Sequence, residues 1–403
     1  MKFGEDVHVP ESVMVMILVR LPTRAVSRFK SVCFQWKSLL GSRYFRDLYR
    51  SVNQRNLFSP WSMMREEPRA KVGMVEYFGE RWGLKESPGT CLLRFLDDHT
   101  KQRGKAVAIT DGLVLIEECD ILRPSKFLVG SPVLQQWINI PSPPTLQDRR
   151  TPCKTALVTN VNNNGDLLGY KVVKYELGFS ASGGFHFQCY SSETGNWTYH
   201  QVFRDHIIFK NYNGRDLEPI NLNGWLLWHC PGVKLILAYD FYPTTDQEPQ
   251  QLFRLIDLPD DESFGYKETC SVAVSCGSLV YIRYHTGQFR VWRLKNHKTD
   301  PSKEHWELLW NVINDGQELL VIGGISSCFV VTMHPFDSEV VYLEGHGNTH
   351  KYLISGNLRT EKFQVLKAYK KNGGQTFWKF VLPQRHDSIP CPPGCSLVSK
   401  PEV

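Results

Sequence analysis

A spaced series of aromatic residues constrains the fold of this chain more than any other feature. Strand-like segments begin with an aromatic residue at intervals of 60, 56, 53 and 57 residues, at Trp137, Trp197, Phe253, Trp306 and Phe363. Units of about 50 residues with several strands each are typical of propeller blades, which stack because one blade cannot bury both of its faces. The 403-residue chain has 352 residues after position 51, enough for about six such units.

Two of these units also resemble each other in detail. Gly224-Trp-Leu-Leu-Trp228 matches Gly277-Ser-Leu-Val-Tyr281 at an offset of 53 residues, and the same offset relates Tyr239 to Trp292 and Phe253 to Trp306. We therefore expect a large all-β region built as an irregular six-unit β-propeller-like ring. Phe377–Leu382 falls outside the spacing and is expected to be a strand that closes the ring. Two stacked β-sandwiches with coincidental spacing are the alternative.

The fit to this pattern is uneven. Residues 52–105 show the repeat poorly, and Gly323-Gly324 is the single match to the double glycine of kelch repeats. The segment from His386 onward is rich in Pro and Ser, a composition typical of disorder.

The N-terminal segment has helical spacing instead. Pro10-Glu11-Ser12 is a plausible helix start, with the Ser12 hydroxyl as cap. Val13, Met16, Ile17 and Leu21 follow as one apolar stripe, and Leu18 adds apolar surface on a second face. A second stripe is formed by Val32, Cys33, Trp36, Leu39 and Leu40. About forty residues in short helices bury too little surface to be stable alone, so this bundle is expected to lean on a partner or on the next domain.

Residues 9–40 read VPESVMVMILVRLPTRAVSRFKSVCFQWKSLL. This stretch resembles the F-box of the large plant F-box family in Ile17-Leu18, Arg20-Leu21-Pro22, Arg28-Phe29-Lys30, Val32-Cys33, Trp36 and Leu39. Later segments resemble the F-box-associated domain of the same family: Tyr190–Trp197, Asn223-Gly224 with Trp228, and Ala238–Asp240 with Leu258-Pro259. Val9, Val13 and Met16 depart from the family pattern. Met16 stands where the family has an acidic residue, so the resemblance implies a weaker polar contact to the adaptor with the apolar face retained.

The resemblance implies the organisation and the role of the chain. Residues 1–51 would be the F-box, a small all-α bundle; residues 52–385 the F-box-associated β-domain that recognises a target; and residues 386–403 a disordered tail. The F-box would bind a Skp-type adaptor and, through it, a cullin. The chain would then be the non-catalytic substrate receptor of an SCF-type ubiquitin ligase, for a target that the sequence does not identify. The adaptor-binding residues carried over from the family are Pro10, Ile17, Leu18, Leu21, Pro22, Val26, Arg28, Val32, Cys33 and Trp36, with Arg28 pairing to an acidic group.

Charge and cysteine usage limit the other partners. Residues 1–51 carry nine Lys or Arg and four Asp or Glu, a net +5 of the chain's +6. These basic residues alternate with apolar ones, which favours a protein partner over nucleic acid. The chain holds no secretory signal and no run long enough to span a membrane, so we expect it in the nucleus or cytoplasm. The eleven Cys include no C-x-x-C pair, and Cys391 with Cys395 predicts unpaired thiols, not a metal site. No cofactor is expected.

Two other functions remain open at this stage. One is an enzyme on a propeller scaffold, but G-x-S-x-G, H-E-x-x-H and Walker motifs are absent, and His346 and His350 flank a turn sequence. The other is a glycan- or metabolite-binding propeller acting outside a ligase, in which Trp225 or Trp61 would stack on sugars. The competing interpretation of both tryptophans is that they are core residues of strands.

Overall fold

We analysed a computed structural model of the chain. The structure describes the following residues: 10–21, 26, 29, 32–42, 44–45, 48–49, 52, 60–67, 70, 72–81, 84–99, 104–120, 123–144, 153–162, 166–176, 184–203, 219–230, 234–243, 252–259, 269–285, 287–295, 305–313, 325–370, 377–382 and 388–399.

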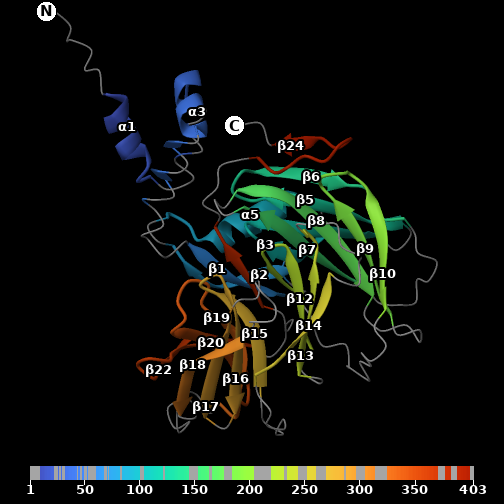
Figure 1. The fold of residues 1–403 in the computed structure, drawn as a ribbon. Helices are drawn as coiled ribbons and strands as arrows, with labels where there is room; N and C mark the ends of the chain where they lie inside the picture. The colour runs from blue at the N-terminus through green and yellow to red at the C-terminus, as the bar shows by residue number, and fades with distance from the viewer. Residues whose placement is uncertain are drawn as a thin grey trace, which may run out of the picture.

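The N-terminal part is a small helical bundle that projects from the rest of the molecule (Figure 1). It contains α1 (Glu11–Leu18) and α3 (Phe34–Gly41). Its core consists of Val15, Leu18, Val19, Val26, Leu40, Phe45 and Tyr49, all buried. Tyr49 donates a hydrogen bond from its hydroxyl to the Leu21 carbonyl, 3.0 Å away, which ties the end of the bundle to its first helix. None of the described helices is long and apolar enough to cross a bilayer.

The described strands, all of which follow the helical bundle in the chain, form six sheets, which we call blades 1 to 6. Blade 1 has β23 (Phe377–Val381), β1 (Trp61–Glu66) and β2 (Met74–Glu80). Blade 2 has β3 (Gly104–Thr110), β4 (Leu113–Asp120), β5 (Arg123–Ser131) and β6 (Gln136–Ile140). Blade 3 has β7 (Cys153–Val161), β8 (Leu167–Glu176), β9 (Gly184–Ser191) and β10 (Trp197–Phe203).

The other three blades each have four antiparallel strands. Blade 4 has β11 (Ile220–Leu222), β12 (Trp225–Cys230), β13 (Leu235–Asp240) and β14 (Phe253–Asp257). Blade 5 has β15 (Thr269–Ser275), β16 (Ser278–His285), β17 (Gln288–Lys295) and β18 (His305–Ile313). Blade 6 has β19 (Ser327–Met333), β20 (Val340–His346), β21 (His350–Asn357) and β22 (Lys362–Lys370).

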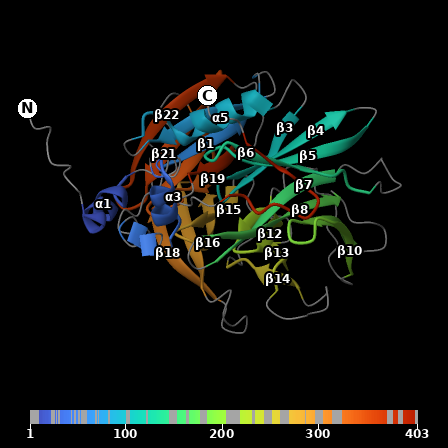
Figure 2. The ribbon, with the colours of Figure 1, turned by 90° about the horizontal axis from the view of Figure 1, so that it is seen from above.

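The blades close into a ring, so the six-bladed propeller expected from the sequence is confirmed. The first strands of successive blades lie side by side from β23 through β3, β7, β11 and β15 to β19. Figures 1 and 2 show the blades following one another around a common centre. Each of the six junctions between neighbouring blades has its own apolar core. In a β-sandwich each sheet buries only one face, whereas each sheet here buries both faces against its two neighbours. The alternative of two stacked sandwiches is therefore excluded.

The spaced aromatic residues have one structural meaning: each is the first or second residue of the fourth strand of a blade. The Trp197 indole Nε1 donates to the Pro141 carbonyl just beyond β6, 2.8 Å away. The Trp306 Nε1 donates in the same way to the Asp257 carbonyl at the end of β14, 2.7 Å away. These two tryptophans therefore fasten blades 3 and 5 to the blades before them.

Two of the three residue matches predicted between blades 4 and 5 hold in the structure. Two-residue turns with positive φ, Asn223-Gly224 and Cys276-Gly277, precede the matching strands β12 and β16. Phe253 pairs with Tyr239, and Trp306 pairs with Leu294. Phe253 and Trp306 are thus equivalent, but Tyr239 corresponds to Leu294 and not to Trp292. The β16–β17 hairpin is longer than its counterpart, which shifts the offset by two residues.

Blade 1 explains why residues 52–105 show the repeat poorly. It has three strands, and α5 (Pro88–His99) takes the place of a fourth. Leu92, Phe95 and Leu96 of α5 are buried in the core between blades 1 and 2. The Glu76 carboxylate of β2 anchors the start of α5 by accepting hydrogen bonds from Ser62 Oγ at 2.5 Å and Ser87 Oγ at 2.6 Å.

The ring is closed between the two ends of the propeller sequence. As expected, Phe377–Val381 forms a closing strand, β23, which pairs with β1 from Trp61↔Val381 to Arg65↔Phe377. Next to this junction the buried Arg65 guanidinium lies 4.4 Å from the Tyr369 ring centre and 3.8 Å from a Glu344 oxygen. The first and last thirds of the propeller are therefore held together by both strand pairing and a buried charged cluster.

The expectation of a disordered tail was wrong for residues 388–399. β24 (Leu397–Ser399) pairs with β6 and becomes a fifth strand of blade 2. Ile389 is 3% exposed and lies in the core between blades 2 and 3. Cys395 Sγ lies 3.5 Å from the Tyr190 hydroxyl. The Pro- and Ser-rich composition concealed these anchoring residues, which bury enough surface to offset the entropy of ordering the segment.

Candidate adaptor-binding face

Helix α1 begins where the sequence predicted, but not with the predicted cap. Pro10 is the N-cap residue and its carbonyl accepts hydrogen bonds from the backbone N–H groups of Val13 and Met14, at 3.0 and 3.1 Å. Ser12 lies inside the helix, and no side chain caps it. Proline suits this place because its fixed φ leads into a helix and it has no N–H to satisfy.

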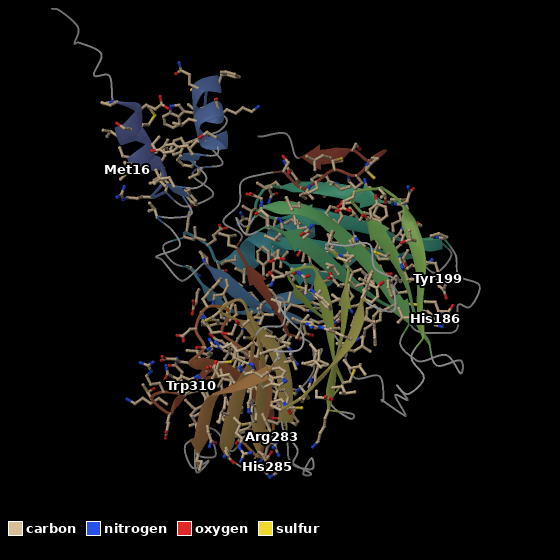
Figure 3. All side chains as sticks on the ribbon, in the orientation of Figure 1. Met16, His186, Tyr199, Arg283, His285 and Trp310 are labelled. Atoms are coloured by element: carbon tan, nitrogen blue, oxygen red, sulfur yellow. The ribbon has the colours of Figure 1, made fainter. Side chains whose placement is uncertain are left out.

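The two faces of α1 differ in exposure although both are apolar. Val15, Leu18 and Val19 point into the bundle core and are at most 3% exposed. On the opposite side Val13, Met16 and Ile17 are 47%, 44% and 55% exposed. Figure 3 shows Met16 on α1, pointing away from the propeller. An apolar face of this size on so short a helix indicates a surface that a partner covers.

The start of α3 also carries exposed apolar side chains. Cys33 is the N-cap, and its Sγ accepts a hydrogen bond from the Trp36 backbone N–H at 3.5 Å. Val32 and Phe34, on either side of it, are 63% and 84% exposed. The Trp36 ring packs edge-on against Phe29, with ring centres 5.0 Å apart, and is half-buried. We call Val13, Met16, Ile17, Val32 and Phe34 the apolar face.

The ten residues carried over from the family fall into four groups. Pro10, Ile17, Val32 and Cys33 are exposed, and Leu21 and Trp36 are half-buried. Leu18 and Val26 are 2% and 0% exposed and fill the bundle core, so they can position the face but do not reach its surface. Pro22 and Arg28 lie outside the described residues.

Phe34 is the exposed residue that the sequence patterns missed. It is not part of the 3–4 spaced stripe from Val32 to Leu40, and so it was not expected to bind. The signal that could have found it is its position directly after a helix cap, where a side chain of the first turn lies outside the helix–helix contact.

The described residues named for the enzymatic and sugar-binding alternatives lie in structural positions. In the parts of the chain that the structure describes, no three His, Cys, Asp or Glu side chains gather as metal ligands would. His346 and His350 flank a hairpin closed by a hydrogen bond from Gly347 N to the His350 carbonyl, so they lie at a turn as predicted. Trp61 is fully buried and cannot stack on a sugar. Trp225 is half-buried and covered by the Arg254 guanidinium, 4.5 Å from its ring centre.

The buried thiols are poor nucleophiles. Burial raises the pKa of Cys230 to about 12 and that of Cys328 to about 11. Because the thiolate is the reactive form, these residues stay protonated and inert at neutral pH. Both lie in the apolar cores between blades.

A helical bundle with an exposed apolar face, joined to a six-bladed propeller, defines the class of F-box proteins with a β-propeller. Residues 59–390 match the family model described as "F-box protein At3g26010-like, beta-propeller", and the chain belongs to this family.

Relatives from Arabidopsis thaliana match over almost the full length. F-box protein At3g26010 is 31% identical, over 99% of this chain and 95% of its own. F-box protein At1g49990 is 30% identical, over 98% of this chain and 100% of its own. Putative F-box/kelch-repeat protein At1g15680 is 32% identical, over 89% of this chain and 83% of its own. The similarity to plant F-box proteins expected from the sequence is thus confirmed.

Proposed function

We propose that this chain is the substrate-recruiting subunit of an SCF-type ubiquitin ligase. Its F-box would bind a Skp-type adaptor that docks on a cullin, and its propeller would hold a target protein. We place it in the nucleus or cytoplasm, where that machinery acts. The single observation that carries the proposal is the apolar face on α1 and α3, which is exposed while the core beneath it is complete.

The physical contribution of such a subunit is proximity. A target held on the propeller meets the charged conjugating enzyme at a high effective concentration, which turns a bimolecular encounter into a nearly intramolecular one. No bond needs to be made or broken by this chain. Burial of Cys230, which raises the pKa of its thiol, disfavours a thioester relay through that residue, because the relay requires a reactive thiolate.

The test is adaptor binding by the full-length chain. Ile17→Asp combined with Phe34→Asp puts two charges on the apolar face, where desolvating them on binding is costly. We expect adaptor affinity to fall by at least a hundredfold in a pull-down or calorimetric titration. Leu168→Asp is the matched control, since Leu168 is 54% exposed on β8 of the propeller. Full adaptor binding by the double variant would refute the proposal.

A further inference from the structure

The last described segment of the chain crosses two blades. We call residues 388–399 the strap. Its strand β24 lies along β6 of blade 2 (Figure 1), and Ile389 lies in the apolar core between blades 2 and 3. A Cβ added at Gly195, in the turn before β10, would lie 2.7 Å from the Pro393 carbonyl oxygen. The strap is therefore packed against both blades.

Two cysteines flank a tight turn in the strap. The Cys395 backbone N–H donates to the Pro392 carbonyl at 3.1 Å, and Gly394 has a φ of 76°. Proline followed by a glycine with positive φ is typical of a type II turn, which holds its first and fourth α-carbons within about 7 Å, the upper limit for a disulfide. Cys391 lies one residue before this turn, and its Sγ donates to the Cys395 carbonyl at 3.4 Å. The turn thus places the first sulfur beside the residue that carries the second.

The two thiols differ in their surroundings. Cys391 is exposed, whereas Cys395 is half-buried. Cys395 Sγ donates to the Asn139 carbonyl of β6 at 3.5 Å and lies 3.5 Å from the Tyr190 hydroxyl of β9. A small oxidant from solvent can therefore reach Cys391 directly, and Cys395 is the neighbouring thiol that can react next. Thiols that sense oxidants are accessible and lie beside a second, resolving cysteine in this way.

The other cysteines do not form such a pair in the sequence. Cys270 and Cys276 are the next closest, and they lie at opposite ends of β15, about 20 Å apart along an extended strand. Metal binding is a poor alternative for Cys391 and Cys395, because no third His, Cys, Asp or Glu gathers with them among the described residues. In the nucleus or cytoplasm, where we place the chain, disulfides are usually transient and redox-sensing. A pair of thiols that oxidises reversibly fits that setting.

We propose that Cys391 and Cys395 form a redox-sensitive dithiol that hydrogen peroxide converts into a disulfide. The Cys391 thiolate attacks one peroxide oxygen and the O–O bond breaks, which gives a sulfenic acid and a hydroxide that takes up the proton lost by the thiol. The Cys395 thiol then attacks the sulfenic sulfur, the S–S bond forms, and the S–O bond breaks with release of water. Two thiols and one hydrogen peroxide thus give one disulfide and two waters. Glutathione restores both thiols by exchange and is itself oxidised.

The disulfide changes how the strap is held. A disulfide sulfur carries no hydrogen, so the hydrogen bonds from Cys391 to the Cys395 carbonyl and from Cys395 to the Asn139 carbonyl are both lost. Asn139 is the neighbour of Ile138, with which β24 pairs, so the second loss weakens the attachment of the strap to β6. The edge of blade 2 is less firmly covered in the oxidised chain. The inference does not depend on the ligase role.

The experiment uses the full-length chain, treated with hydrogen peroxide and then with an alkylating reagent. Trypsin releases residues 386–403 as one peptide, whose only cysteines are Cys391 and Cys395. We expect mass spectrometry to find this peptide unalkylated and two hydrogens lighter. This form should be at least tenfold more abundant than all other oxidised forms of the peptide, because the second thiol is held at a high effective concentration. After treatment with glutathione, both cysteines should be alkylated.

Serine variants assign the two roles. Cys395→Ser removes the resolving thiol but keeps a hydroxyl donor for the Asn139 carbonyl, so Cys391 should persist as a sulfenic acid that dimedone captures. Cys391→Ser should give no disulfide and at least tenfold less captured sulfenic acid in this peptide. Cys276→Ser, at an exposed cysteine outside the strap, is the matched control and should form the disulfide as the natural chain does.

Any of three results would overturn the inference. The first is a peptide without a disulfide in samples where Cys276 is already oxidised. The second is a disulfide from either strap cysteine to another cysteine or another chain as the main product. The third is an equal yield of captured sulfenic acid in the two serine variants. Deuterium exchange of residues 397–399 should be at least twofold faster in the oxidised chain, and unchanged exchange would refute the effect on the strap.

Discussion

The helical bundle and the propeller differ in how much of their apolar side chains they leave exposed. The bundle keeps one small core and leaves Val13, Ile17, Val32 and Phe34 exposed. The propeller buries both faces of its sheets in six separate cores and closes the ring with β23. A domain that needs a partner can remain small, whereas a ring must be complete before any of its junctions is stable. The two regions should therefore respond differently to damage.

The largest effect should come from opening the ring. Truncation after residue 376 removes β23 and leaves β1 without one of its two neighbours. We expect insoluble protein, because the exposed strand edges and the cores at both junctions of blade 1 are lost together. Deleting residues 216–263, which include all four strands of blade 4, should have the same result. A soluble deletion variant with a sharp thermal transition would show that the blades are independent.

The next effect separates the two faces of α1. Leu18→Ala leaves a cavity in the bundle core and should lower bundle stability by about 2–5 kcal/mol. Its neighbour Ile17→Ala should change stability by no more than about 0.5 kcal/mol but weaken adaptor binding. Hydrogen exchange of residues 10–52 measures the first effect and titration with adaptor the second. If Leu18→Ala and Ile17→Ala changed bundle stability and adaptor binding to the same extent, the two faces of α1 would not have distinct roles.

A smaller loss is expected where α5 packs on blade 2. A Cβ added at Gly130 would lie 2.5 Å from Phe95 Cζ, so Gly130→Ala must push α5 away from the sheet. We expect a cost of about 1–3 kcal/mol, seen as a lower melting temperature of the propeller. Gly41→Ala in the bundle is the control, since nothing lies within 4 Å of its added Cβ. If Gly130→Ala and Gly41→Ala had the same melting temperature, the added Cβ at Gly130 would not strain the contact between α5 and blade 2.

A comparable effect is a pH dependence confined to the propeller. Burial lowers the pKa of His229 to about 4, below its ordinary value of 6.5. Between these values the unfolded chain binds the proton and the folded chain does not, so stability falls as pH falls from about 6.5 to 4. We expect His229→Gln to reduce this loss by roughly 1–3 kcal/mol, measured by denaturant unfolding. His350→Gln, on an exposed hairpin, should retain the full dependence.

The sequence predicted those parts of the molecule that have a periodic pattern. The aromatic residues that begin the fourth strands and the six-unit ring followed from spacing, and the closing strand at Phe377 was expected because it falls outside that spacing. Helix α5 was missed because Leu92, Phe95 and Leu96 form one short helical stripe among strands. At the candidate adaptor-binding face the pattern showed that α1 is apolar, but not that Leu18 is inside and Ile17 outside. Which side of α1 faces the bundle core depends on where the other helices pack. A local sequence pattern does not hold that information.

The pairing of β1 with β23 has a consequence for the synthesis of the protein. The first strand of the ring begins at residue 61 and its last partner ends at residue 381. The ribosome must therefore release the chain as far as residue 381 before the ring can close, while the F-box helices have emerged long before. A premature stop codon before residue 377 would yield an open propeller joined to a complete bundle. Under the proposed function, such a product would occupy the adaptor without being able to present a target.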